Sequence, residues 1–321
     1  MPVLFKLVRK MKYLVLCVVF FLLLAGAKAS EYNVGVVWAG KSSMSERVLY
    51  GFEYRLKELK VDVDLDVQSS LKDIDTLDRT VKAFEAEGKD ALVVLRSNGS
   101  AYLGANPPSI PTFIGGGNLP SELGSVKNMD APEGNVTGVT YYLPIEVPLE
   151  SYLAITPKVK SFLLINQKGY PSSAIDWKGT EKTCKALNLK CANGLISSRE
   201  ELVELVKGRI SEFDAVILGN QALAFENVDA ILEHVNNKPI YSYAAEGVKR
   251  GALGGVVADD VKLGSMLADS FFEVIINNKP IKTVPVKMDD KPAIILNAKA
   301  IDNLKLEISP LLLNFSKFVD N

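Results

Sequence analysis

From residue 32 onward, apolar and polar positions follow two alternating patterns. Short apolar runs, such as YNVGVVWA at 32–39 and ALVVL at 91–95, predict buried strands. Between the runs, apolar residues recur at helical spacing, as at Val48, Phe52 and Leu56. Strands that alternate with amphipathic helices are typical of repeated β–α–β units, in which the strands form a parallel sheet.

The predicted strands fall into two groups. The first group lies at 32–39, 61–67, 91–95, 111–116 and 135–139, and its strictly alternating run at 61–67 suits the edge of a sheet. The second group follows the Pro144–Pro157 segment and lies at 161–166, 191–197, 214–219, 239–243 and 252–258, with one helix expected over 222–234. A helix from Val261 to Ile275 and strands at 283–287 and 293–297 complete the chain.

This order predicts an α/β protein with two doubly wound, Rossmann-like lobes. The last segment is too short for a third domain, so its elements must complete the two sheets through a hinge that the chain crosses several times. We expect the first lobe at 30–140 plus about 258–288, and the second at 141–257 plus about 289–321. In open α/β sheets the ligand site lies at the carboxyl ends of the strands, which here face a cleft between the lobes.

The first 29 residues have the features of a signal peptide. They carry five positive charges and no acid, and the apolar run Tyr13–Ala25 is too short for a membrane-spanning helix. Ala27-Lys28-Ala29 fits a cleavage signal, so we expect a mature chain from Ser30; the alternative is an uncleaved anchor. The prediction is a periplasmic or otherwise exported protein, soluble after cleavage.

Removal of this segment changes the charge balance. The chain has 37 Lys and Arg against 38 Asp and Glu; without the five leading cations, 32 face 38, a net charge of −6. An acidic protein without a basic stripe is not expected to bind nucleic acid. Cys184 and Cys191 remain in the mature chain and could form a disulfide in an oxidising compartment, or stay two separately buried thiols.

The motifs of enzyme chemistry are weak. Residues Gly35–Ser42 match G-x-x-x-x-G-K-[ST], but Val36, Val37, Trp38 and Ala39 belong to a strand rather than to a phosphate-binding loop. The glycine run at 115–117 lacks dinucleotide-binding spacing. With His234 as the only histidine, neither a metal site nor a catalytic set containing histidine can be assembled. We therefore expect no enzyme and no cofactor.

Several stretches resemble a known family. Gly134–Val139 (GNVTGV), Glu246–Leu253 (EGVKRGAL), the following Asp260–Gly264 and the late run Ile294–Asn297 (IILN) are similar, in the same order, to the ABC transporter substrate-binding proteins that include tryptophan- and tyrosine-binding members. The resemblance implies a type I periplasmic-binding-protein fold that captures a small solute, often an amino acid or related carboxylate, and delivers it to an ABC permease. We expect a monomer.

The strand-end loops supply the candidate ligand-binding residues. They are Trp38, Ser42, Ser43, Arg96, Ser97, Asn98, Gly117 and Asn118 in the first lobe, and Tyr170, Asn220, Gln221, Tyr243 and Glu246 in the second. The resemblance favours Asn220, where the family shows a Thr-Asp-Asn-like loop, and Glu246, where it shows an acid. Trp38 could instead belong to the core.

Two departures from the family pattern bear on the ligand. The fourth strand is followed by Gly-Gly-Gly-Asn instead of a Thr-Asp-Pro-like turn, and Arg96 follows the third strand. Arg96 could clamp a carboxylate or phosphate, or point outward and pair with a surface acid. Two other function classes stay open: a sensory protein that presents its closed form to a membrane receptor, and an exported enzyme on the same scaffold.

Overall fold

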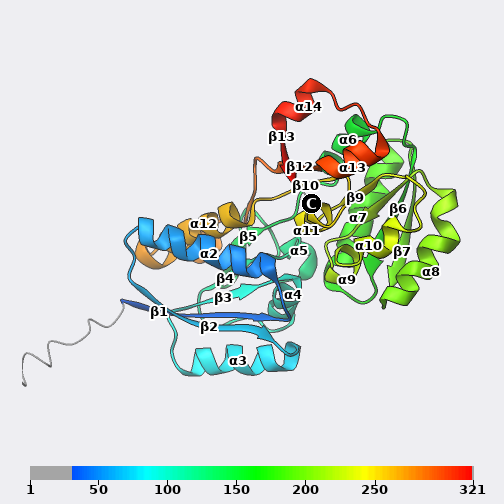
Figure 1. Ribbon diagram of the computed structural model, residues 1–321. Coiled ribbons are helices and arrows are strands. Elements are labelled where there is room, and N and C mark those ends of the chain that lie inside the picture. The colour runs from blue at the N-terminus through cyan, green and yellow to red at the C-terminus, as the bar shows by residue number, and fades with distance from the viewer. Residues whose placement is uncertain (1–30, 320–321) are drawn as a thin grey trace, which may run out of the picture.

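The chain folds into two lobes, each built around its own β-sheet (Figure 1). The computed structural model describes residues 31–319, so the predicted signal peptide at 1–29 lies outside the described residues. No helix within 31–319 is both long enough and apolar enough to cross a membrane.

The first sheet has six strands in the order β11-β5-β4-β3-β1-β2, and all of its pairs are parallel. Its strands are β1 (Tyr32–Ala39), β2 (Val63–Leu71), β3 (Ala91–Leu95), β4 (Thr112–Gly115), β5 (Val136–Thr140) and β11 (Lys287–Met288). Its helices are α2 (Ser43–Glu58), α3 (Ile74–Ala86), α4 (Ser97–Ala105), α5 (Pro120–Leu123) and α12 (Asp260–Phe271). The alternating strand, β2, lies at the sheet edge as its pattern predicts.

The second sheet has seven strands in the order β13-β12-β10-β9-β8-β6-β7, and only the β10–β12 pair is antiparallel. Its strands are β6 (Ser161–Gln167), β7 (Lys190–Ile196), β8 (Ala215–Leu218), β9 (Ile240–Ser242), β10 (Gly254–Val257), β12 (Ala293–Asn297) and β13 (Ser316–Val319). Its helices are α6 (Glu146–Ile155), α7 (Pro171–Ala186), α8 (Arg199–Arg209), α9 (Ala222–Phe225), α10 (Val228–Leu232), α11 (Ala245–Lys249), α13 (Ala298–Leu304) and α14 (Pro310–Phe315).

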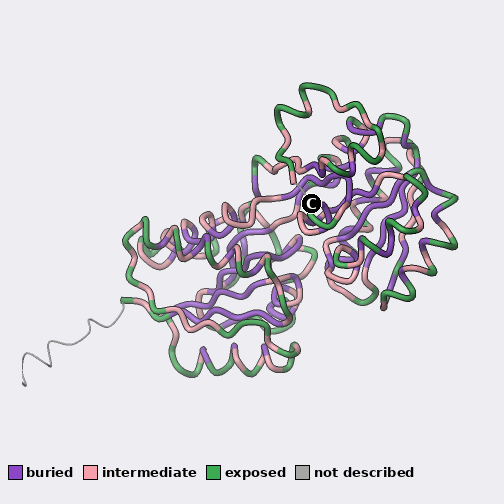
Figure 2. Tube along the Cα trace, viewed as in Figure 1, coloured by how far each residue is buried: buried purple, intermediate pink, exposed green. Residues whose placement is uncertain are grey.

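The chain passes between the sheets three times: after β5, after β10 and between β11 and β12. The central strands are the most deeply buried elements of both lobes (Figure 2), and apolar clusters cover both faces of each sheet. A doubly wound α/β architecture with two lobes is therefore confirmed.

Three local expectations need correction. The helix expected over 222–234 is interrupted: α9 and α10 are separate, and the Asn227 side chain between them donates to the Leu223 carbonyl. Residues 283–287 form no continuous strand, because a 3-10 turn at Ile281–Thr283 precedes the two-residue β11. The C-terminal α14 and β13 were not anticipated; they carry exposed Leu311, Phe315 and Phe318 and lie at the top of Figure 1.

Cys184 and Cys191 form a disulfide with a Cα–Cα distance of 6.2 Å. The bond joins the last turn of α7 to β7 across a separation of seven residues. We expect replacement of both cysteines by Ala to lower the free energy of unfolding by about 2 kcal/mol, because the short loop loses its constraint in the unfolded chain. Urea unfolding measures this loss. A reductant should destabilise the wild type similarly and leave the double variant unchanged; an unresponsive wild type contradicts the prediction.

Candidate functional site

The carboxyl ends of strands from both sheets meet at a cleft between the lobes. From the first lobe, the segments after β1, β3, β4 and β5 reach it, and from the second lobe those after β6, β8, β9 and β10. Two cavities lie side by side in this cleft and share Met44, Tyr141, Asn220 and Glu246 as wall residues. Parallel strands bring these loops together because all of their carboxyl ends point to one edge of the sheet.

The first cavity, called the acidic cavity here, has a volume of about 40 Å³, which is room for a few water molecules. Polar and aromatic groups from both lobes line it, with an apolar wall formed by residues such as Leu143 and Val256. Its polar and aromatic residues are Asn118, Tyr141, Tyr142, Asp176, Asn220, Tyr243, Glu246 and Asp260. The arrangement provides acceptors for a cation beside rings that can pack on an apolar group.

Asp176 is the buried carboxylate of the acidic cavity. It lies near the start of α7 and is only 5% exposed. Asn118 Nδ2 donates to Asp176 Oδ1 across the cleft at 2.8 Å, and Gln221 Nε2 donates to Asp176 Oδ2 at 2.8 Å. No Lys, Arg or His within residues 31–319 forms an ion pair with it.

Burial raises the pKa of Asp176 to about 6, although the amide groups of Asn118 and Gln221 and the backbone N–H of Asn220 favour its ionised form. At neutral pH the carboxylate is therefore mainly ionised, with neutral donors alone to compensate its charge. A buried charge in this position is stabilised when a ligand brings a cation to it.

The tyrosines of the acidic cavity stay protonated. Burial raises the pKa of Tyr141, whose hydroxyl lies 3.4 Å from Ser97 Oγ, and that of Tyr243, whose hydroxyl shares a 2.8 Å hydrogen bond with Thr180 Oγ1. Their rings form walls from opposite lobes. Neutral hydroxyls beside aromatic faces can bind polar and apolar parts of one ligand.

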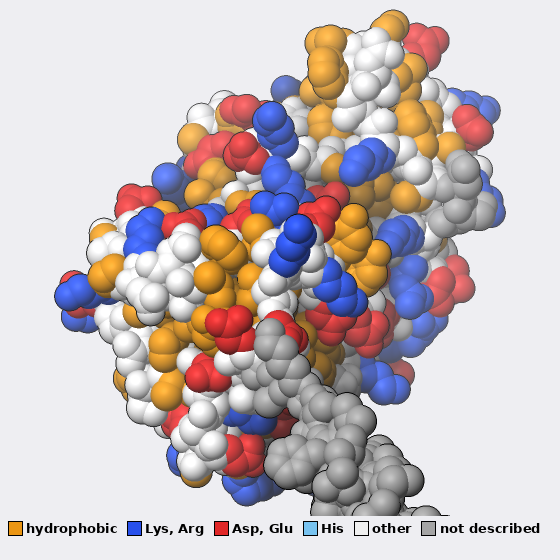
Figure 3. Space-filling model, turned by 90° about the vertical axis from the view of Figure 1, so that its left-hand side faces the viewer, with side chains coloured by type: hydrophobic (Ala, Val, Ile, Leu, Met, Phe, Trp, Pro, Cys, Tyr) orange, Lys and Arg blue, Asp and Glu red, His pale blue; other side chains and the backbone are white. Residues whose placement is uncertain are grey.

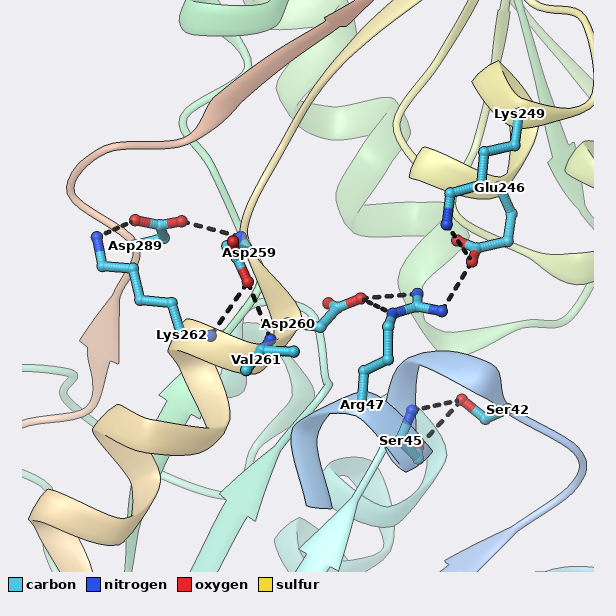
Figure 4. A network of polar contacts seen from close by, with 10 residues as sticks. All are labelled: Ser42, Ser45, Arg47, Glu246, Lys249, Asp259, Asp260, Val261, Lys262 and Asp289. Atoms are coloured by element: carbon cyan, nitrogen blue, oxygen red, sulfur yellow. Dashed lines mark hydrogen bonds and ion pairs between the residues drawn. The ribbon is translucent and has the colours of Figure 1, made fainter. Parts of the chain in front are cut away.

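Arg47 links the two lobes at the edge of the acidic cavity (Figure 4). Its Nη1 lies 2.9 Å from Glu246 Oε1 of the second lobe, and its Nη2 lies 2.8 Å from Asp260 Oδ2 of the first. Burial raises the pKa of Asp260 to about 6, against the attraction of Arg47. Two of the three cavity acids are thus already paired with Arg47, which distinguishes them from Asp176.

The second cavity, called the basic cavity here, adjoins the first and has a volume of about 210 Å³. Three cationic side chains line it together with serine hydroxyls from the loop after β1 and the start of α4. Its polar residues are Lys41, Ser42, Ser43, Arg96, Ser97, Tyr141, Tyr170, Asn220, Glu226, Glu246 and Arg250. Ser42 also caps α2, accepting a hydrogen bond from the backbone N–H of Ser45 at 3.1 Å.

Most residues anticipated from the sequence lie on the cavity walls. Ser42, Ser43, Arg96, Ser97 and Tyr170 line the basic cavity. Asn118 and Tyr243 line the acidic cavity, and Asn220 and Glu246 line both. Glu246, expected to be a ligand contact, already bonds to Arg47.

Four anticipated residues do not line either cavity. Trp38 belongs to the core cluster that packs on α2 and α12, because its face of β1 is the one shared with Val34 and Val36. Asn98 accepts a hydrogen bond from the backbone N–H of Gly99, so its side chain serves the start of α4.

The other two of the four support their neighbours. The Gly117 carbonyl accepts hydrogen bonds from Thr140 Oγ1 and from the backbone N–H of Tyr141, which joins the loop after β4 to the end of β5. Gln221 is 2% exposed and holds Asp176 rather than facing a ligand.

Sequence reasoning missed Asp176, Tyr141, Arg47 and Asp260. One signal for Asp176 was present: it precedes Thr180 by four residues and Cys184 by eight, so it lies on the buried stripe of α7. An acid on the apolar face of a helix is either paired or functional.

The P-loop-like match has the structural role expected of it. Residues 35–39 lie within β1, followed by the loop that caps α2, so the P-loop-like match is a strand. Within residues 31–319, no group of His, Cys, Asp and Glu side chains could hold a metal ion.

Comparisons with known proteins bear on the family and the fold of the chain. A family model described as ABC transporter substrate binding protein matches residues 34–318. A curated tyrosine-binding protein from Clostridioides difficile is 27% identical over 286 residues, covering 86% of this chain and 82% of the relative.

Two solved structures share the fold. One, an ABC domain from Streptococcus pneumonia in complex with L-Trp, has a TM-score of 0.80 at 22% identity, covering 90% of this chain and 100% of that one. The other, a ligand-free, open substrate binding protein with adhesive properties from Clostridium difficile, has a TM-score of 0.77 at 18% identity, covering 90% and 99%. The type I periplasmic-binding-protein fold is thereby confirmed.

Proposed function

The chain belongs to the family of ABC transporter substrate-binding proteins, and we propose that it is the exported solute-binding component of an importer. Members of this family bind substrates and are not enzymes. The proposed ligand is a small solute with an ammonium group, in the first place an amino acid, captured between two closing lobes and passed to a membrane permease.

One observation carries the choice of ligand class: the buried Asp176 carboxylate has no cationic partner among the described residues and lies on a cavity wall. An ammonium group would compensate this charge, and the Tyr141 and Tyr243 rings would pack on the remainder of the ligand. The tyrosine-binding relative and the relative in complex with L-Trp support amino acids as the class.

Closure of the lobes is supported by polar contacts that cross the cleft. Arg47 bonds to Glu246, Asn118 bonds to Asp176, and Lys178 Nζ lies 2.7 Å from Glu122 Oε1. Each pair joins a residue of one lobe to a residue of the other, so these contacts break when the lobes separate. A ligand that bonds to both lobes would add to the same set and favour the closed form.

A ligand screen tests the proposed function. We expect at least one amino acid to raise the melting temperature by about 5 °C or more at a concentration 100 times its dissociation constant, because it binds only the folded protein. Differential scanning fluorimetry measures the shift, with N-acetylated versions of the same amino acids as controls. Equal shifts with acetylated and free amino acids would contradict an ammonium site.

The importer role has its own test. Deletion of the gene should abolish uptake of the ligand found in the screen, and a variant without binding should not restore uptake. If ligand response is lost while uptake is unchanged, the partner is a receptor rather than a permease.

A further inference from the structure

The basic cavity contains more positive charge than the proposed function requires. Lys41, Arg96 and Arg250 all line it, and none of them forms an ion pair with any residue within 31–319. Arginines elsewhere in the described chain, such as Arg55 and Arg199, do pair with acids. The three cations therefore offer free charge to whatever enters the cavity.

The acids of the same cavity do not cancel this charge. Glu226 and Glu246 line it, but Glu246 is bonded to Arg47 at 2.9 Å and lies 3.6 Å from Lys249. Three positive charges thus face the one negative charge of Glu226. Acidic and basic side chains are intermixed on the face in Figure 3. The chain without its five leading cations is acidic, so the three cations of the basic cavity form a local positive site.

Arg96 is held in place by both lobes. Its Nη1 donates to the Ala39 carbonyl of the first lobe at 2.6 Å, and its Nη2 donates to the Tyr170 hydroxyl of the second lobe at 3.0 Å. These bonds use two of the five N–H donors of the guanidinium, which leaves three for a ligand. The side chain also lies against Gly40, where an added Cβ would be 2.5 Å from Nη1.

The backbone of Arg96 is strained. Its φ of 76° and ψ of 162° fall in a region that is almost confined to glycine. Such strain persists where the surroundings fix the residue, and it gathers at ligand clamps. The geometry thus fixes a cation at the end of β3, facing the cavity.

We propose that the basic cavity binds a second acidic group of the ligand, so that the substrate is an acidic amino acid: a small molecule with one ammonium group and two anionic groups. This inference rests on the proposed function, which supplies the ammonium site at Asp176. The α-carboxylate balances one of the two excess positive charges, and the second acidic group balances the other. The cavities share walls at Met44, Tyr141 and Asn220, so one ligand can occupy both.

Matched ligands test the proposal by titration calorimetry. We expect L-glutamate or L-aspartate to bind at least 30-fold more tightly than L-glutamine or L-asparagine, which differ only in the second acidic group. A phosphono analogue of glutamate forms a separate arm: tighter binding than glutamate identifies a phosphonate as the preferred group, and weaker binding identifies a carboxylate.

Three variants test which cations of the basic cavity bind the second acidic group. Arg96→Gln should weaken the acidic ligand at least 30-fold and its amide, which keeps only the α-carboxylate, by a smaller factor. Lys41→Gln and Arg250→Gln, both at exposed residues, should each weaken the acidic ligand several-fold without affecting folding, which keeps the test valid if Arg96→Gln fails to fold.

Failure of the acidic-ligand inference can be distinguished from failure of the proposed function. If glutamine, tyrosine or tryptophan binds as tightly as glutamate and aspartate, or if none of the three variants affects the acidic ligands selectively, the acidic-ligand inference is overturned and the amino-acid function stands. If no compound with an ammonium group binds, both the proposed function and the acidic-ligand inference are wrong.

Discussion

Replacement of Asp176 by Asn is expected to weaken binding of the ammonium ligand about 100-fold or more. The variant keeps the shape of the side chain but removes the buried cavity carboxylate that has no ion-pair partner within residues 31–319, and loss of one partner of a buried charge pair costs about 2–5 kcal/mol. Titration calorimetry measures the change in affinity.

Asp302→Asn is the matched control, because Asp302 is exposed on α13 and does not line the cleft. It should leave affinity unchanged. An Asp176→Asn protein that melts cooperatively and binds with wild-type affinity would show that the ammonium lies elsewhere.

In the wild type, falling pH should raise the stability of the unliganded protein and lower its affinity for the ligand; both trends should be weaker in Asp176→Asn. The pKa of Asp176 is raised from 3.8 to about 6 in the folded protein, so the folded state binds this proton more tightly than the unfolded chain does. The free energy of unfolding of the unliganded protein should therefore gain up to about 3 kcal/mol from this group as pH falls from above 6 to below 4. Ligand affinity should fall over the upper part of this range, because the ammonium needs the ionised carboxylate.

Asp260 also contributes to the pH dependence of stability, because its pKa is raised to about 6 as well. Its contribution to the free energy of unfolding also grows as pH falls, and this contribution is still present in the Asp176→Asn variant. The difference between wild type and variant at each pH therefore isolates Asp176. A difference that does not change between pH 4 and pH 7 would contradict the raised pKa.

The sequence predicts the strands and the position of the cleft well, because local burial determines both. The runs at 91–95 and 293–297 match β3 and β12 residue for residue, since each is a short apolar segment between polar ones. Parallel order then places the loops after the strands at one edge of each sheet, and Asn118, Asn220 and Tyr243 are found there.

The side of a strand that a residue faces is harder to predict. Strands of parallel sheets are buried on both faces, so β1 shows no polar alternation along Val36, Val37 and Trp38 that would indicate which side each faces. Trp38 could equally face the core or a ligand by sequence, and only the packing of α2 and α12 places it in the core.

Asp176 shows a second reason why the site could not be fully predicted from the sequence. Charged residues on predicted helices are usually solvated, and the burial of this one depends on where α7 lies relative to the opposite lobe. Asn118, which bonds to it, is 58 residues away in the chain. The hydrogen bond between Asn118 and Asp176 therefore depends on how the two lobes pack, and the sequence around neither residue predicts it.

The packing of α2 against α12 leads to the second large expected effect, on stability. Gly264 of α12 lies directly against the backbone of α2: an added Cβ would collide with the Val48 carbonyl oxygen and lie 2.8 Å from the Phe52 nitrogen. Backbone atoms cannot move aside as a flexible side chain can, so Gly264→Ala must push the helices apart. We expect the free energy of unfolding to fall by about 3 kcal/mol, at the upper end for overpacked cores.

Gly208→Ala is the matched control for this prediction. Gly208 lies exposed in α8 with no atom within 4 Å of an added Cβ, so the same substitution should stabilise the protein by about 0.5–1 kcal/mol through helix propensity. Urea unfolding of the two variants should therefore give changes of opposite sign. Since Arg47 of α2 and Asp260 of α12 form an ion pair beside the acidic cavity, Gly264→Ala should also weaken ligand binding. Equal stability of the two variants would show that the helices are not in contact at Gly264.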